Sequence, residues 1–177
     1  MKATGVVRRI DELGRIVIPK EIRRTLKIKE GTPLEIYSGD NGELLLKKYS
    51  PVVELGKIAE DVAESIYIAT GKNVIITNME SVIAYFGKNK NNYIEKNIDS
   101  KIERLINSRK SQIVKMSDEN SMLFYSAENI QLYVISPIML NGDVFGSIII
   151  FDDNNNLSNC EVIIATSFSQ YLSKQIG

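Results

Sequence analysis

The sequence predicts an α+β protein of two domains, residues 1–50 and 51–177. One observation is the charge: residues 1–50 hold 11 Lys and Arg against 7 Asp and Glu, whereas residues 51–177 hold 11 against 15. Another is the order of the expected elements, since short strands dominate the first part and helices accompany antiparallel strand pairs in the second. The third is Ser50-Pro51, because proline interrupts the preceding structure and is favoured at the start of a helix.

The first domain is expected to contain four short strands and one short helix. The strands are predicted at residues 6–10, 15–18, 33–37 and 43–47, and the helix at residues 19–26. Asp, Asn and Gly lie between the paired strands, where tight turns favour them. These 50 residues contain no Phe, Trp or Cys. A single copy can bury little core and has no disulfide to compensate, so we expect an intertwined homodimer.

The predicted helix begins at Pro19 and is about two turns long, too short to be stable without packing. Ile22 and Leu26 are four residues apart, so they share one face and are expected to point inward. Arg23 and Arg24 fall on other faces and are expected to point outward. The helix therefore presents two guanidinium groups to a partner.

Four arginines, Arg8, Arg15, Arg23 and Arg24, are the candidate DNA-binding residues. A guanidinium group keeps its charge and can hydrogen-bond phosphate oxygens or a guanine edge as a fork. The alternative is that these side chains are solvated or form ion pairs with the acidic residues of the same stretch. A homodimer doubles the four arginines to eight, which favours double-stranded DNA with its repeated charge.

The second domain is predicted to be an antiparallel sheet with helices on it. Helices are expected at residues 52–70, 99–107 and 161–176, and strands at residues 73–77, 81–85, 132–140 and 144–151. Asn141-Gly142 is the strongest hairpin signal in the chain, because both residues accept the positive φ of a type I′ turn. Ser158 followed by Glu161 is a capping box that begins the last helix.

Apolar residues recur at helical spacing on the first and last of these helices. The predicted apolar faces are Val52, Leu55, Ile58, Ala59, Val62, Ile66 and Ala69, and Val162, Ile163, Ala165, Thr166, Phe168 and Leu172. Core packing is the favoured interpretation of both faces, and contact between subunits is the alternative.

The composition argues against an enzyme. The chain has no His and a single Cys, Cys160, so a Ser-His-Asp triad, a Cys-His pair and a zinc or haem site are excluded, and we predict no catalytic residue, metal or cofactor. Residues 152–156 fail as a calcium loop because Leu157 stands where glycine is required. Without a signal peptide or a membrane-length apolar segment, a cytoplasmic protein is expected.

Residues 4–26, TGVVRRIDELGRIVIPKEIRRTL, resemble the N-terminal DNA-binding domain of AbrB-type transition-state regulators, and residues 34–36 and 45–49 continue the match. The resemblance implies a dimeric β-barrel in which two chains exchange strand hairpins. The DNA-contacting arginines of that family match Arg8, Arg15, Arg23 and Arg24.

The whole chain resembles the sporulation regulators of this family, in which the same domain is followed by a GAF-like domain. Residues 47–51 and 54–56 resemble the junction of those proteins, and residues 136–138, 141–143, 146 and 150–151 resemble their last hairpin. The resemblance implies a regulator of late genes in the forespore that both activates and represses, is associated with the nucleoid, and forms tetramers through helices of the GAF-like domains.

Two alternative functions come from other classes. The same N-terminal fold occurs in antitoxins that neutralise a toxin, although such proteins usually end in an acidic, poorly ordered tail rather than in dense apolar periodicity. The GAF-like domain could also serve mainly as a sensor of an unidentified small ligand, for which the sequence shows no nucleotide-binding loop.

Overall fold

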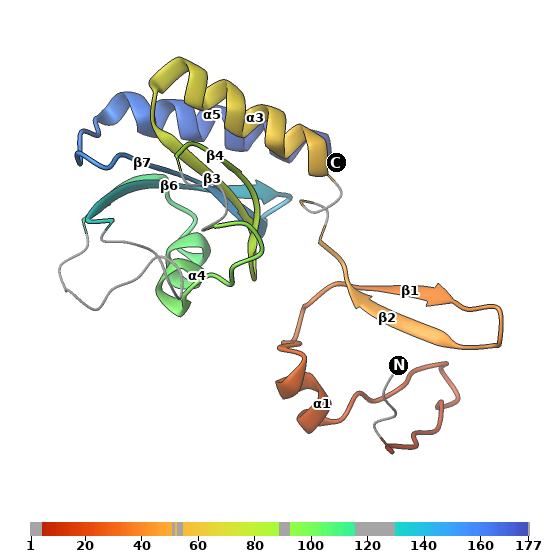
Figure 1. Ribbon diagram of the computed structural model, residues 1–177. Coiled ribbons are helices and arrows are strands. Elements are labelled where there is room, and N and C mark those ends of the chain that lie inside the picture. Colours follow the sequence, from red (N-terminus) through yellow and green to blue (C-terminus); the bar gives the residue numbers. More distant parts are fainter. Residues whose placement is uncertain (1–4, 51, 53–54, 89–92, 116–129, 177) are drawn as a thin grey trace. The chain divides into compact units, whose positions relative to one another are not determined.

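The computed structural model describes residues 5–50, 52, 55–88, 93–115 and 130–176. The chain divides into two compact units, Met1–Tyr49 and Ser50–Gly177, and each is described by itself (Figure 1).

The first unit contains the short helix α1 (Lys20–Thr25) and the hairpin of β1 (Leu34–Ser38) and β2 (Leu44–Lys48). Pro19 is the N-cap of α1, so the predicted helix is confirmed to within one residue at each end. The hairpin is antiparallel, and its turn closes with a 2.8 Å bond from the Gly39 amide to the Glu43 carbonyl oxygen.

The strands predicted at residues 6–10 and 15–18 do not form in this single chain. Only the turn between them is present, where the Asp11 amide donates to the Arg15 carbonyl oxygen at 3.0 Å and the Gly14 amide to the Asp11 carbonyl oxygen at 3.0 Å. A strand needs a partner edge, and a lone hairpin of this length is only marginally stable in water. The prediction of two strands is therefore wrong for the isolated chain.

The first unit has no interior of its own, because none of its described residues is buried. Val7 and Val17 are 85% and 72% exposed, and Ile22 is the half-buried member of the α1 face on which Leu26 stays 53% exposed. The inward orientation predicted for Leu26 is therefore not met. Aliphatic side chains gain free energy only when they leave water, so these residues lack their stabilising contacts in one chain.

The second unit is an antiparallel sheet of five strands with helices on both faces. The helices are α3 (Gly56–Thr70), α4 (Ser100–Asn107) and α5 (Asn159–Ile176), and the strands are β3 (Asn73–Asn78), β4 (Val82–Phe86), β5 (Gln112–Lys115), β6 (Leu132–Leu140) and β7 (Asp143–Phe151). The strand order is β4-β3-β7-β6-β5. Sequence reasoning missed β5 and began the first helix at Val52, four residues before α3 begins.

Helices α3 and α5 lie on one face of this sheet and α4 lies on the other (Figure 1). Each face carries a layer of buried apolar side chains. Along β7, Ile148 and Ile150 pack with α3 and α5, whereas Ile149 and Phe151 pack with the layer that includes α4. Because successive side chains of a strand point to opposite faces, the unbroken apolar run of β7 fits a strand buried on both sides.

Three glycines have a specific structural role in this unit: one in a strand turn, one at a close approach of two strands and one at a helix end. Asn141 and Gly142 have φ of 51° and 88°, which confirms the tight turn between β6 and β7. A Cβ at Gly146 would lie 2.0 Å from the Thr77 carbonyl oxygen, so glycine is required for β7 to reach β3. Gly71, with φ of 69°, ends α3 as predicted.

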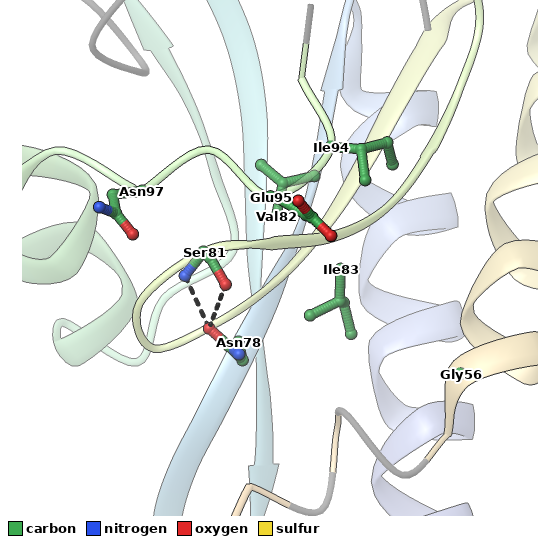
Figure 2. Close-up of a pocket in the computed structure, with 8 residues that line it drawn as sticks. All are labelled: Gly56, Asn78, Ser81, Val82, Ile83, Ile94, Glu95 and Asn97. Atoms are coloured by element: carbon green, nitrogen blue, oxygen red, sulfur yellow. Dashed lines mark hydrogen bonds between the residues drawn. The ribbon is translucent and has the colours of Figure 1, made fainter. Parts of the chain in front are cut away.

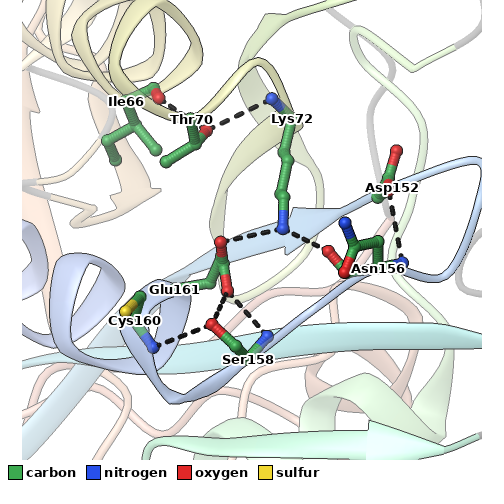
Figure 3. Close-up of polar contacts among 8 residues, drawn as sticks. All are labelled: Ile66, Thr70, Lys72, Asp152, Asn156, Ser158, Cys160 and Glu161. Atoms are coloured by element: carbon green, nitrogen blue, oxygen red, sulfur yellow. Dashed lines mark hydrogen bonds and ion pairs between the residues drawn. The ribbon is translucent and has the colours of Figure 1, made fainter.

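The start of α5 is fixed by a nearly buried ion pair (Figure 3). Lys72 Nζ donates to Glu161 Oε1 at 2.8 Å, and the Ser158 amide donates to Glu161 Oε2 at 2.7 Å, as a capping box requires. Burial alone would raise the pKa of Glu161, but the bonds from Lys72 and Ser158 outweigh it and hold that pKa at about 2. Lys72 also donates to the Asn156 carbonyl oxygen, which ties the preceding loop to the same site.

The buried stripe of α5 differs from the predicted one. It consists of Glu161, Ala165, Ser169 and Leu172, whereas Ile163 is 65% exposed. Ser169 can be buried because its hydroxyl lies 2.8 Å from that of Ser136 on β6, which satisfies both polar groups.

Candidate nucleic-acid interface

Arg15 is the most ordered of the four candidate arginines. Its Nε donates to Asp11 Oδ2 at 2.7 Å, although the Arg15 side chain as a whole is 71% exposed. The pKa of Asp11 is lowered, most strongly by the hydrogen bond from the Arg15 amide and next by the hydrogen bond from the Arg15 side chain. The alternative of internal ion pairing is therefore correct for Arg15, and it leaves most of the guanidinium group accessible.

Arg8 lies in the segment before the turn and is exposed. Its one contact among the described residues is a bond of 3.4 Å from Nη1 to the carbonyl oxygen of Val7. At that length the bond is weak, so the side chain is held much less firmly than Arg15.

Arg23 and Arg24 are exposed in the last turn of α1, as the helical spacing predicts. Across the described part of the chain, neither side chain has a hydrogen bond or an ion pair. Two adjacent unpaired guanidinium groups on a short helix form a concentrated positive charge, which attracts phosphate oxygens.

The role of Arg8, Arg15, Arg23 and Arg24 in DNA binding stays a prediction. Sequence reasoning named Asp11, Glu12 and Glu21 as possible ion-pair partners of the arginines but did not choose among them. The sequence does contain a signal that favours Asp11. An Asp three residues before a Gly, with an Arg directly after that Gly, is typical of a turn stabilised by the Asp side chain.

The second unit has a pocket of about 440 Å³ at the end of β3 (Figure 2). Its lining residues are Gly56, Asn78, Ser81, Val82, Ile83, Ile94, Glu95 and Asn97. Asn78 Oδ1 accepts from the Glu80 and Ser81 amides, each at 2.7 Å, so that oxygen already serves the turn. None of the lining residues that the structure describes is basic.

Other kinds of site are not found in the described residues. They hold no group of three or more Cys, Asp or Glu side chains that could bind a metal ion. Cys160 is exposed and not in a disulfide. None of the helices in the described ranges combines the length and apolar character that crossing a bilayer requires.

Two family models match the chain. The model described as stage V sporulation protein T C-terminal, transcription factor, matches residues 54–177. The model described as antidote-toxin recognition MazE, bacterial antitoxin, matches residues 7–53. The two matches together cover both units of the structure.

Two relatives from Bacillus subtilis (strain 168) are similar in sequence. Stage V sporulation protein T is 42% identical over 178 residues, which cover 99% of this chain and 99% of that protein. The transition state regulatory protein AbrB is 48% identical over 75 residues, which cover 42% of this chain and 77% of that protein.

The second GAF domain of DevS from Mycobacterium smegmatis is similar in structure. It has a TM-score of 0.54 at 12% identity and covers 68% of this chain and 91% of that chain. At this identity the likeness shows the fold alone, and it confirms the predicted GAF-like architecture of the helix-covered sheet.

An AbrB-type DNA-binding domain followed by a GAF-like domain defines a transcription regulator of two domains. This confirms the predicted fold class and the predicted class of function. The chain belongs to the stage V sporulation protein T family, as its identity along the full length of that protein shows.

Proposed function

We propose that residues 1–50 bind double-stranded DNA as a homodimer through Arg8, Arg15, Arg23 and Arg24, and that residues 51–177 control assembly or sense a signal. The observation that carries the proposal is the 42% identity with stage V sporulation protein T along 99% of both chains. Exposure of all four arginines supports their role, since a side chain that contacts DNA must be accessible.

The dimer is supported by the missing core of the first unit. Its exposed aliphatic residues flank the turn at residues 11–14, and the segments on both sides of that turn have backbone groups that make no ladder in one chain. Exchange of these segments between two chains would pair their backbones and bury their side chains. One chain would then complete the strands that the other lacks.

The biological setting follows from the family. We propose that the protein regulates late sporulation genes in the forespore, activating some and repressing others, as a cytoplasmic protein associated with the nucleoid and without enzymatic activity. The absence of His and the single Cys support a role in binding rather than in catalysis.

Pairing of two dimers into a tetramer is supported by exposed apolar residues on α3 and α5. Ile68 is 74% exposed, Ile163 is 65% exposed and Tyr171 is 46% exposed, and the first is on α3 while the other two are on α5. In the proposed tetramer a second subunit would cover these side chains. A small ligand of the GAF-like domain, if it uses the pocket near Asn78, would be uncharged or cationic.

The DNA-binding proposal can be tested by fluorescence anisotropy of a labelled A·T-rich duplex over a salt series. If all eight arginines of a dimer contacted phosphate, the slope of log K against log salt would approach ~ −7, and Arg23→Ala/Arg24→Ala would remove up to about half of it. Lys101→Ala/Arg104→Ala removes two exposed positive charges from α4 and is the matched control. Unchanged affinity and slope in the Arg23/Arg24 variant, with folding intact, would overturn the assignment.

The match of residues 7–53 to an antitoxin model favours toxin neutralisation as a second candidate function. A small protein that copurifies with the chain and whose toxicity the chain suppresses would support it. The second unit argues against it, because its buried sheet is unlike the acidic tail with which such antitoxins wrap a toxin.

A further inference from the structure

We propose that Asp11 positions Arg15 for DNA by holding the Nε side of the guanidinium group and turning the two Nη groups outward. Asp11 would thus be a positioning residue of the DNA interface, although its own charge repels DNA. The inference rests on the proposed function, because it assumes that Arg15 contacts the duplex.

The two carboxylate oxygens of Asp11 perform different tasks. Oδ1 accepts from the Leu13 amide at 3.0 Å and from the Arg15 amide at 2.8 Å, which stabilises the turn. Among the described residues, Oδ2 accepts only from Arg15 Nε, at 2.7 Å, which orients the side chain. Gly14, with φ of 75°, supplies the left-handed backbone that lets the turn close on Asp11.

The backbone bonds make the arrangement rigid. The Asp11 amide donates to the Arg15 carbonyl oxygen at 3.0 Å, so the two residues are joined by their main chains as well as by their side chains. A bond to Nε fixes the last torsions of an arginine, which are otherwise free in an exposed residue. The order of the Arg15 guanidinium group therefore derives from Asp11.

The orientation suits recognition of an anion. With Nε taken by Asp11, the two Nη groups remain, and in the described part of the chain they have no hydrogen bond. They form a pair of parallel donors that fits two phosphate oxygens or the O6 and N7 atoms of guanine. An ordered arginine loses less conformational freedom on binding than a free one, which increases affinity.

The electrostatic effect of Asp11 on its own has the opposite sign. A carboxylate beside DNA weakens binding, and the bonds from Arg15 lower the pKa of Asp11, so the residue stays ionised at neutral pH. Glu12 is the next residue, is exposed, and has no bond to its side chain among the described residues. Neutralising either carboxylate removes a repulsion from DNA, and this effect alone should strengthen binding. Only neutralising Asp11 should also release the Arg15 side chain.

The experiment compares Asp11→Asn with Glu12→Gln in the full-length protein, each alone and in an Arg15→Ala background. Asn keeps an oxygen for the two amides of the turn but places an NH₂ group where Oδ2 was, so the turn survives and Arg15 is released. Binding to the labelled duplex is measured by anisotropy over a salt series. Sedimentation and circular dichroism show whether each variant keeps its dimer and its fold.

We expect Asp11→Asn to bind about three- to tenfold more weakly than Glu12→Gln, because an unordered Arg15 must be fixed on binding. In the Arg15→Ala background the two variants should have equal affinity, since Asp11 acts through Arg15. This loss of the difference is a result that a merely structural role for Asp11 would not give, because damage to the turn would persist without the Arg15 side chain.

Two outcomes would overturn the inference about Asp11 and leave the proposed DNA-binding function standing. One is equal binding by Asp11→Asn and Glu12→Gln while Arg15→Ala weakens binding. The other is a defect of Asp11→Asn that persists in the Arg15→Ala background. If instead Arg15→Ala binds as well as the unmodified protein, the proposed DNA site fails at Arg15, and the failure lies in the proposed function.

Discussion

The two units of this chain have similar aliphatic content, but only the second unit buries its aliphatic side chains. In the second unit, Ile148, Ile149 and Ile150 are buried completely between a sheet and its helices, whereas in the first unit Ile10 and Ile16 are 65% and 54% exposed. The difference is not in the residue types but in whether one chain supplies both sides of a core. Burial in the second unit is therefore intramolecular, and in the dimer that we propose, burial in the first comes from a second copy of the chain.

From this comparison we expect the largest loss of stability from a substitution in the sheet of the second unit. Ile150→Ala should lower the free energy of unfolding by about 2–5 kcal/mol, because it leaves a cavity in a core from which water is excluded. Gln170→Ala, at an exposed position on α5, is the control and should change it by about 0.5 kcal/mol or less. Both are measured by denaturant unfolding of the full chain, and a loss at Ile150 that grows on dilution would mean that this core is shared between chains.

A smaller effect is expected at the ion pair that begins α5. Glu161→Gln should cost about 2 kcal/mol, because Lys72 loses its charged partner in a nearly buried site. The folded-state pKa of Glu161, about 2, lies below its ordinary value of 4.5, so its contribution is complete above that value and is lost as the pH falls toward 2.

The pH dependence supplies the measurement for this pair. The difference in unfolding free energy between the unmodified protein and Glu161→Gln should be constant near neutral pH and shrink between about pH 4.5 and pH 2. Glu64→Gln, at an exposed position of α3, is the control and should show no such change. A difference that stays constant down to pH 2 would contradict the assigned pKa.

The smallest effect per chain is expected in the first unit, and it should depend on concentration. Ile16→Ala should cost about 1 kcal/mol for each chain, because in the proposed dimer a second copy covers this side chain. Sedimentation over a dilution series should show that the variant dimer dissociates at higher protein concentration than the unmodified dimer. Equal dissociation of the two proteins would show that Ile16 lies outside the subunit interface.

Sequence patterns predicted those features of the second unit that depend on residues close together in the sequence. The turn at Asn141 and Gly142, the cap at Ser158 and the long strands around them all depend on nearby residues, and all are present. The buried face of α5 was less predictable, because burial of Ser169 depends on a hydrogen bond with Ser136 in a distant strand. A periodicity of apolar residues cannot reveal such a polar pair in advance.

The first unit shows the opposite limit. Its hairpin and helix were predicted from local residues, but the strands on both sides of Asp11 need a partner edge that one chain does not offer. Their aliphatic pattern is that of a strand, and the pattern says nothing about which molecule provides the neighbour. The four arginines were found by their charge, whereas the contact between Asp11 and Arg15 required the geometry of the turn.

None of residues 5–49 is buried in the single chain, and this has a consequence for how the activity of the proposed dimer depends on protein concentration. If two copies are needed to complete the DNA-binding half, the amount of competent protein rises with the square of the chain concentration when chains are scarce. A newly made chain would display uncovered aliphatic segments to proteases until it met a second copy. A modest rise in synthesis would then produce a steep rise in occupied promoters, without any effector molecule.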